Sequence, residues 1–263
     1  GDGKLITTIY KPVNGDFNYF PDSNIDFQFE INKKIYSGKT GWTLTDVEKF
    51  SDARSGDGAM IILTSLDKKI SLTLQFLLYP GSPAIRKNLV IKNLSGQTVQ
   101  LESVDVEKFY VTDYAATTFS WICHDYGRRR PIGPYDGNAQ DALLTVHNND
   151  WRQGIVIGNE ASGSIKQTSV FRDERAIITG LTHRDARVPF RKYIAKGQSF
   201  TTPQVFTMVY NDHTDPDEML NTAVPDFVRK YMGIRLSELK EKPTFVYNTW
   251  IPFGQNINEQ LVK

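Results

Sequence analysis

The sequence lacks disulfides, long apolar runs and an excess of either charge. Its 263 residues include one cysteine, Cys123, so no intrachain disulfide can form. No apolar run approaches the roughly 20 residues that span a bilayer. The 31 basic residues nearly balance the 30 acidic ones, giving a net charge of +1. This balance provides no electrostatic surface for nucleic acid or for an anionic membrane, and we expect neither as a partner.

Motifs of several large enzyme classes are absent as well. The sequence has no G-x-x-x-x-G-K-[ST], no G-x-G-x-x-G and no G-x-S-x-G. Its four histidines are isolated from one another, and none occurs in H-E-x-x-H or beside paired cysteines. We therefore predict no metal and no cofactor. No pair of carboxylates stands out as the acid and nucleophile of a glycosidase, so no catalytic residue is assigned.

Alternation of apolar and polar residues dominates the rest of the chain. Ile70, Leu72, Leu74, Phe76 and Leu78 share one face of a strand with period two. Further strands are expected at 26–31, 85–92, 98–109, 143–147, 154–158, 176–181, 188–194 and 204–210. Many antiparallel strands without intervening helices predict an all-β fold, a large β-sandwich of two packed antiparallel sheets.

Helix signals appear late in the chain. The segment Asp-Pro-Asp-Glu at 215–218 combines a capping residue, a first-turn proline and acidic residues near the positive end of the helix dipole. We expect this helix to run to Ala223, where Pro225 interrupts it, and a second short helix to follow over 226–232. Residues 212–242 are therefore predicted to form a short helical connector.

The last residues, 243–263, have another pattern. Phe245, Val246 and Tyr247 are typical of a short buried strand, and a loop follows. Asn256 and Glu259 form a capping-box pattern that predicts the start of a helix. Strand, loop and helix make the first unit of a β/α repeat, which cannot bury its faces alone. We expect this segment to begin a (β/α) barrel.

Two stretches carry a resemblance to a known family. The triplet Asn248-Thr249-Trp250 resembles the Asn-x-Trp that ends the first barrel strand of α-galactosidase-like enzymes, family 36 of the glycoside hydrolases. Residues 154–166 resemble part of the N-terminal β-supersandwich that precedes the barrel in that family. The resemblance implies a galactose mutarotase-like supersandwich over 1–211, the connector over 212–242, and a chain truncated just after the barrel begins at 243–263.

The same resemblance implies where catalysis and sugar binding occur. The nucleophile and the acid/base of the family lie on later barrel strands, which this chain does not contain. The implied partners are the missing catalytic barrel, the carbohydrate substrate of the intact enzyme and a second copy of the chain in a homo-oligomer. Asn248 and Trp250 would lie at the mouth of the barrel, near the sugar. The chain starts at Gly1 rather than Met, and removal of a signal peptide from a secreted or periplasmic bacterial protein is one explanation.

A second group of candidate sugar contacts lies within the sandwich. The region 123–141 is predicted to be a long irregular loop, because glycines and prolines recur in it, and such loops are often functional. Aromatic faces next to arginine and aspartate suit the hydroxyls of a sugar. The candidates are Tyr126, Arg128, Arg129, Tyr135 and Asp136. The structural alternative is a solvated loop, or a loop that packs on the missing barrel.

Three functions remain open at this point. The first is a non-catalytic N-terminal module that packs on the barrel of an α-galactosidase-like glycoside hydrolase and shapes its substrate site. The second is a mutarotase-like sugar epimerase, with His124 or His147 as the acid and Glu102 or Glu160 as the base. The third is a free-standing carbohydrate-binding module. The start of a barrel favours the first, since a mutarotase has no use for one.

Overall fold

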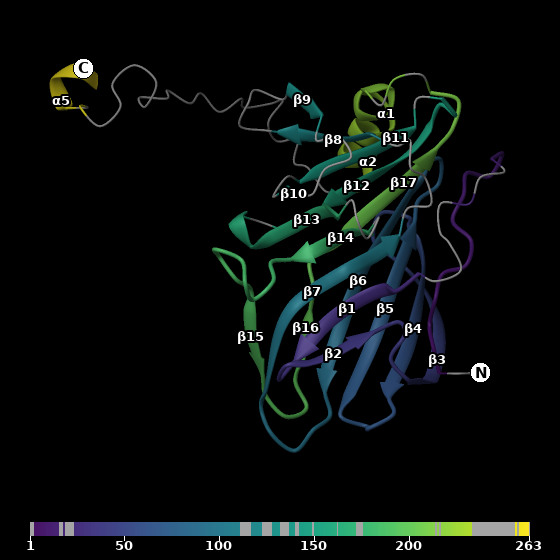
Figure 1. Cartoon of the computed structure of the whole chain (residues 1–263), viewed down its shortest axis with the longest axis vertical. Helices are drawn as coiled ribbons and strands as arrows, with labels where there is room; N and C mark the ends of the chain where they lie inside the picture. The colour runs from purple at the N-terminus through teal and green to yellow at the C-terminus, as the bar shows by residue number, and fades with distance from the viewer. Residues whose placement is uncertain are drawn as a thin grey trace.

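Two antiparallel β-sheets packed face to face make up most of the structure, which confirms the predicted all-β sandwich (Figure 1). The computed structural model describes residues 3–15, 18, 24–110, 117–122, 128–131, 137–139, 142–148, 150–161, 163–171, 176–213, 215, 217–232, 256 and 258–262. For 117–122, 128–131, 137–139, 170–171 and 261–262 it describes the backbone alone.

The larger sheet has ten strands in the described part of the chain, in the order β3-β4-β5-β6-β17-β12-β11-β8-β9, with β16 paired to β6. Their bounds are β3 Trp42–Ser51, β4 Asp57–Ser65, β5 Ile70–Leu78, β6 Ala84–Asn93, β8 Thr117–Ile122, β9 Arg128–Pro131, β11 Leu143–Asn148, β12 Gln153–Asn159, β16 Ser199–Thr201 and β17 Val205–Tyr210.

The smaller sheet has seven described strands, in the order β10-β13-β14-β7-β1-β2, with β15 paired to β7. Their bounds are β1 Asp26–Ile31, β2 Lys34–Ser37, β7 Val99–Tyr110, β10 Gly137–Ala139, β13 Lys166–Phe171, β14 Ala176–Leu181 and β15 Arg191–Ile194. A 3-10 turn, η2 Gly163–Ile165, precedes β13.

Period-two alternation determines which face of each strand enters the core. In β1, Phe27, Phe29 and Ile31 lie between the sheets, where they meet apolar residues of β5, β6 and β7. A second cluster joins β7 and β14 of the smaller sheet to β11, β12 and β17 of the larger one. The ring of Phe29 stacks on Tyr36 of β2 at a centroid distance of 5.5 Å. These contacts bury the apolar face of each sheet against the other.

One ion pair lies inside this core. Lys87 of β6 is 1% exposed, and its Nζ is 2.7 Å from Oε2 of Glu107, on β7 of the opposite sheet. The same ammonium donates to the backbone oxygen of Asp26 at 2.9 Å. Burial raises the pKa of the Glu107 carboxyl to about 7, and the neighbouring Lys87 charge opposes that shift. The pair links β6 of one sheet to β7 of the other across the core.

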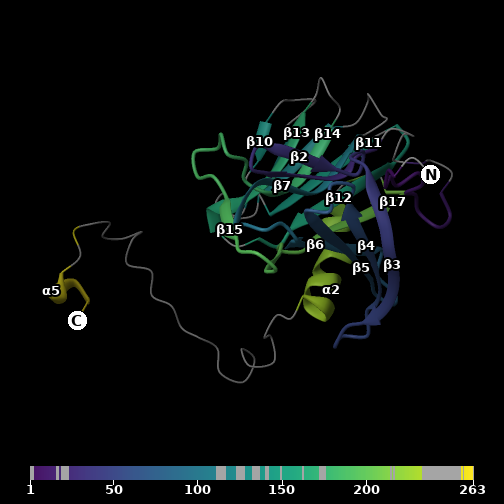
Figure 2. The same ribbon diagram turned by 90° about the horizontal axis from the view of Figure 1, so that it is seen from below.

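Two short helices, α1 Asp217–Asn221 and α2 Ala223–Tyr231, cover part of the outer face of the ten-stranded sheet. Figure 2 shows α2 against this face. Phe227 of α2 packs on Phe206 of β17 at a centroid distance of 4.9 Å. The predicted start is confirmed, because the side chain of Asp215 accepts a hydrogen bond from the Asp217 backbone N–H at 2.9 Å. No helix in the described ranges has the length and apolar character required to cross a membrane.

The predicted break at Pro225 was wrong. The chain turns at Thr222, and Pro225 lies in the first turn of α2. The backbone N–H groups of a first turn have no partner within the helix, so a proline costs little there. The strand predicted over 188–194 is shorter, β15 Arg191–Ile194, and Pro189 in the preceding segment has no N–H to donate to a ladder.

The C-terminal helix also starts later than predicted. The capping pattern placed its cap at Asn256, whereas α5 is Glu259–Val262 and the Asn258 side chain accepts from the Gln260 N–H at 3.1 Å. The strand predicted at 245–247 lies outside the described residues. The division into a sandwich over 1–211, a connector over 212–242 and a barrel start over 243–263 stays a prediction.

Candidate functional site

A β-bulge brings acidic residues together on the outer face of the seven-stranded sheet. The register between β1 and β7 shifts between the pairs Gln28–Asp105 and Glu30–Glu102. Ser103, which lies between the two acidic residues of β7, has a φ of 50°. The extra residue places Glu102 and Asp105 on the same face although they are three positions apart, while Val104 stays in the core.

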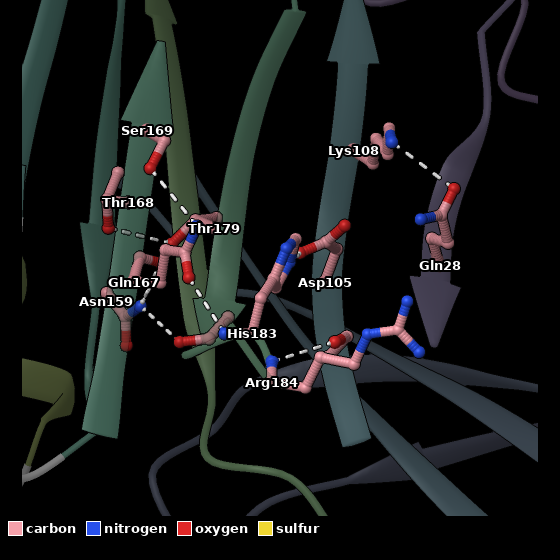
Figure 3. A network of polar contacts seen from close by, with 12 residues as sticks. Gln28, Asp105, Lys108, Asn159, Gln167, Thr168, Ser169, Thr179, His183 and Arg184 are labelled. Atoms are coloured by element: carbon pink, nitrogen blue, oxygen red, sulfur yellow. Dashed lines mark hydrogen bonds and ion pairs between the residues drawn. The ribbon is translucent and has the colours of Figure 1, made fainter. Parts of the chain in front are cut away.

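We call the resulting set of ion pairs the outer-face cluster, and its six members are Glu30, Glu102, Asp105, His183, Arg184 and Arg191. His183 follows β14, and its Nε2 is 2.6 Å from Oδ1 of Asp105. The His183 backbone N–H donates to Oε1 of Gln167 on β13 at 3.0 Å, which fixes the position of the loop (Figure 3).

The electrostatics of this pair favour a charged imidazole. Burial lowers the pKa of His183, but the hydrogen bond and the charge of Asp105 outweigh it, and the net pKa is raised above its ordinary value. Asp105 is 1% exposed, and its Oδ2 is buried without a hydrogen-bond partner among the described residues. The side chain of His183 remains 30% exposed. A ligand in solvent could therefore contact the imidazole but not the carboxylate.

Two arginines complete the cluster. Arg184 Nη1 donates to Oε1 of Glu30 at 2.7 Å. Its backbone N–H donates to the Ser103 hydroxyl at 3.2 Å, the contact drawn from the backbone nitrogen of Arg184 in Figure 3. Arg191 on β15 donates through Nε to Oε1 of Glu102 at 2.7 Å. In each pair the carboxylate is buried and the guanidinium reaches solvent. The cluster therefore presents hydrogen-bond donors to solvent and keeps its carboxylates behind them.

A second polar network lies under α2 on the opposite sheet. Arg86 of β6 is held by Glu160, with Nε–Oε1 and Nη2–Oε2 distances of 2.7 and 2.5 Å. Its Nη1 donates to the hydroxyl of Tyr79 at 2.9 Å, and that hydroxyl donates to Asp52 Oδ2 at 2.8 Å. Nη1 also reaches the backbone oxygen of Tyr231 at 3.3 Å. This network attaches the end of α2 to the sheet.

Most of the predicted sugar contacts fall outside the described residues, namely Asn248, Trp250, Tyr126, Tyr135 and Asp136. Arg128 and Arg129 lie on β9, where their backbones pair with Ile122 and Trp121 of β8. The expectation of one long irregular loop over 123–141 was wrong in part. The described stretches 128–131 and 137–139 form the strands β9 and β10.

The residues considered for an epimerase have other partners. His147 is fully buried, with Nδ1 2.9 Å from the hydroxyl of Tyr210, and the two rings stack. Glu102 is bound by Arg191 and Glu160 by Arg86. His124 lies outside the described residues. The histidine–carboxylate pair that the structure does form, His183 with Asp105, was not among the predicted candidates.

No group of three or more His, Cys, Asp or Glu residues in the described ranges is placed to hold a metal ion. The prediction that the chain holds no metal stays a prediction.

No family model and no curated protein sequence matches this chain, whereas several solved structures superpose on it. The α-galactosidase of Lactobacillus brevis superposes with a TM-score of 0.66 at 15% identity, over 96% of this chain and 37% of that one. The GH36 α-galactosidase AgaA A355E of Geobacillus stearothermophilus, in complex with 1-deoxygalactonojirimycin, gives 0.60 at 15% identity, over 96% and 38%. The galactosidase domain of the α-galactosidase–sucrose kinase AgaSK gives 0.56 at 13% identity, over 73% and 30%.

The chain thus spans under two fifths of the length of these solved structures. At this level of identity the likeness concerns the fold. The described sandwich has the fold of the N-terminal region of GH36 α-galactosidases.

Proposed function

We propose that this chain is a non-catalytic N-terminal module of an α-galactosidase-like glycoside hydrolase. The observation that carries the proposal is the superposition on 96% of this chain and only 37% of the Lactobacillus brevis α-galactosidase. In this proposal the module packs on a catalytic barrel, helps to shape its substrate site and contributes contacts in a homo-oligomer. Asn248 and Trp250 would be its contributions at the mouth of the barrel.

The chemistry of the outer-face cluster supports a non-catalytic role. A retaining glycosidase needs two carboxyl groups about 5–5.5 Å apart, one ionised and one protonated, with a sugar between them. Here Glu30 and Glu102 are each bound to an arginine and Asp105 to His183, at 2.6–2.7 Å. Each acid is already neutralised by a cation and shielded from solvent, so none is available to a glycosidic bond.

The same geometry argues against the epimerase alternative at this cluster. Mutarotation needs an acid and a base that both reach one sugar. His183 is accessible, but the buried Asp105 beside it is not. A polarimetric assay of α-D-galactose mutarotation should therefore show no acceleration by the chain over an equal concentration of imidazole.

The experiment that tests the proposal compares three proteins. They are the full product of the gene, the same product without residues 1–232, and the 263-residue chain. Hydrolysis of 4-nitrophenyl α-D-galactopyranoside should occur with the full product, fall strongly in the shortened form and be absent from the 263-residue chain. A reading frame that ends at Lys263, or titratable turnover by the 263-residue chain, would contradict the proposal.

A further inference from the structure

A cavity of about 370 Å³ opens where three turns of the sandwich meet. The turns join β1 to β2, β4 to β5 and β6 to β7, and they lie at the lower end of the molecule in Figure 1, away from α1 and α2. We call it the turn-end cavity. Its volume is within the range of small-molecule sites, about 300–1,000 Å³. It is separate from both polar networks described above.

The inner wall of the turn-end cavity is apolar and rigid. Ile31, Ile70, Val99 and Tyr36 line it, and all four are almost completely buried in the inter-sheet core. The ring of Tyr36 is fixed by stacking on Phe29. These side chains are only 1–4% exposed, so the wall offers narrow apolar strips of fixed shape, which can contact C–H groups at the edge of a six-membered ring.

The one carboxylate at the mouth of the cavity among the described residues, that of Asp67, is already occupied. Asp67 Oδ2 accepts from Lys34 Nζ at 2.7 Å and from the Tyr36 hydroxyl at 3.2 Å. Asp67 Oδ1 accepts from the Ser65 hydroxyl at 2.6 Å and from the Lys69 backbone N–H at 3.1 Å. Burial opposes the effect, but the hydrogen bonds from Lys34 and Ser65 hold the pKa of Asp67 well below its usual range. The carboxylate therefore stays charged and saturated at neutral pH.

Donors with free N–H groups remain at the mouth. Lys34 gives one of its three ammonium N–H bonds to Asp67, and the ion pairs of the described chain include none from the ammonium of Lys69. Asn32 accepts from the Gln100 N–H through Oδ1, which leaves its side-chain NH₂ to donate. Two lysines against one aspartate leave a net charge of +1 on the lining. A ligand that fits must supply acceptors and about one negative charge.

We propose that the turn-end cavity binds a monoanionic sugar, a pyranose that carries one carboxylate, such as a uronic acid. Lys69 and Lys34 bind the carboxylate, the side chain of Asn32 donates to a ring hydroxyl, and the apolar wall contacts C–H groups at one edge of the ring. A single excess positive charge matches a carboxylate better than the dianion of a phosphate ester. This site is independent of any contribution of the chain to a barrel.

The test is titration of the chain by calorimetry and by amide NMR shifts at about 20 mM salt, where charge interactions are weakly screened. Three probes separate the contributions: D-glucuronate has the ring and the charge, D-glucose the ring alone, and acetate the charge alone. Glucuronate should bind at least about tenfold more tightly than either of the others, and should shift the amides of Asn32, Lys69 and Gly96. A hydrogen bond to a charged group is worth roughly this factor or more.

Neighbouring lysines of one turn supply matched variants. Lys69 lines the cavity, whereas the adjacent exposed Lys68 does not. Lys69→Gln should weaken glucuronate about tenfold. Lys68→Gln removes the same charge from the same turn and should change affinity less than about twofold. Both variants should keep the wild-type melting temperature, because neither ammonium has an ion pair in the described structure.

Several results would overturn the proposal. If glucose bound as tightly as glucuronate, the lysines would not contribute to recognition of the carboxylate. If acetate bound as tightly as glucuronate, the wall would not contribute to binding of the ring. Glucose 6-phosphate tighter than glucuronate would refute the match of one charge to one charge. An equal loss of glucuronate affinity in Lys68→Gln and Lys69→Gln would show that the binding arises from diffuse surface charge and not from the cavity. No detectable binding of glucuronate would end the proposal.

Discussion

Replacing Lys87 by Met is expected to destabilise the sandwich by an amount that depends on pH. The substitution keeps an unbranched side chain of similar length but removes the cation that lies 2.7 Å from Glu107 in the inter-sheet core. Glu107 is 12% exposed, so water does not replace the lost partner. The substitution also removes the 2.9 Å hydrogen bond from the Lys87 ammonium to the backbone oxygen of Asp26. The variant therefore leaves one buried carboxyl and one backbone carbonyl without the donor that bound them.

The magnitude follows from the protonation state of Glu107. Removing one member of a buried ion pair costs about 3–5 kcal/mol when the other stays charged. Burial already raises the pKa of Glu107 to about 7, and loss of Lys87 raises it further, so near pH 5 the carboxyl is protonated in the folded variant. The cost there is mainly that of lost hydrogen bonds, about 1–3 kcal/mol. We expect the destabilisation to be about 2 kcal/mol larger near pH 8.5 than near pH 5.

The wild-type protein has its own pH dependence through the same carboxyl. The pKa of Glu107 is raised from 4.5 to about 7 on folding, so the folded state binds the proton more tightly than the unfolded state. The stabilisation from that proton is complete below pH 4.5 and is lost as the pH rises to about 7. One pKa unit corresponds to about 1.4 kcal/mol, so the total is on the order of 3 kcal/mol. Glu107→Gln should be free of this change.

Urea denaturation of the wild type and variants across this pH range measures each quantity. Lys92→Met, an exposed position on the same strand, is the control and should stay within about 0.5 kcal/mol of the wild type. The double variant Lys87→Met with Glu107→Leu should recover most of the loss, because an apolar pair can replace a buried ion pair. A loss in Lys87→Met that is the same at both pH values, or a double variant no more stable than the single one, would refute the reasoning.

Three further predictions concern the sandwich and its helices. In urea titrations, His183→Gln should destabilise the protein by about 1–2 kcal/mol near pH 6 and by less near pH 9. The pKa of His183 is raised on folding, so its stabilisation is present below the unfolded pKa of about 6.5 and is lost as the pH rises past the folded pKa. Gly180→Ala should lower the melting temperature by several degrees, since a Cβ there would collide with the backbone of β7, whereas Gly96→Ala, with nothing within 4 Å of an added Cβ, should not. Phe227→Ala should cost about 3–5 kcal/mol in urea denaturation, and an unchanged midpoint would show that α2 is not part of the cooperative fold.

Much of the fold could be predicted because one face of each strand meets a packed core. The alternation at Ile70–Leu78 corresponds to β5, and that at 26–31 corresponds to β1. The order of strands could not be predicted, because β7 pairs with β1 and β14, which are distant in sequence, and periodicity carries no information about partners. The helix break was misplaced for a local reason. A proline is a strong signal of interruption, but Pro225 occupies a first turn, where its missing N–H has no consequence.

The polar sites could not be predicted from the sequence, because they depend on features that the hydrophobic periodicity does not encode. Glu102 and Asp105 share a face only because a bulge inserts Ser103, and strict alternation would place them on opposite faces. The partner of Asp105 is 78 positions away, at His183, so no local pattern joins them. The sequence around Asp105 carried no signal of this pair, since Val104-Asp105-Val106 is the ordinary alternation of a strand with its charged residue on the outer face. Alternation alone would place this carboxylate in solvent, whereas it is 1% exposed. Only the fold shows that Asp105 is buried on that face, and only the fold identifies His183 as its partner.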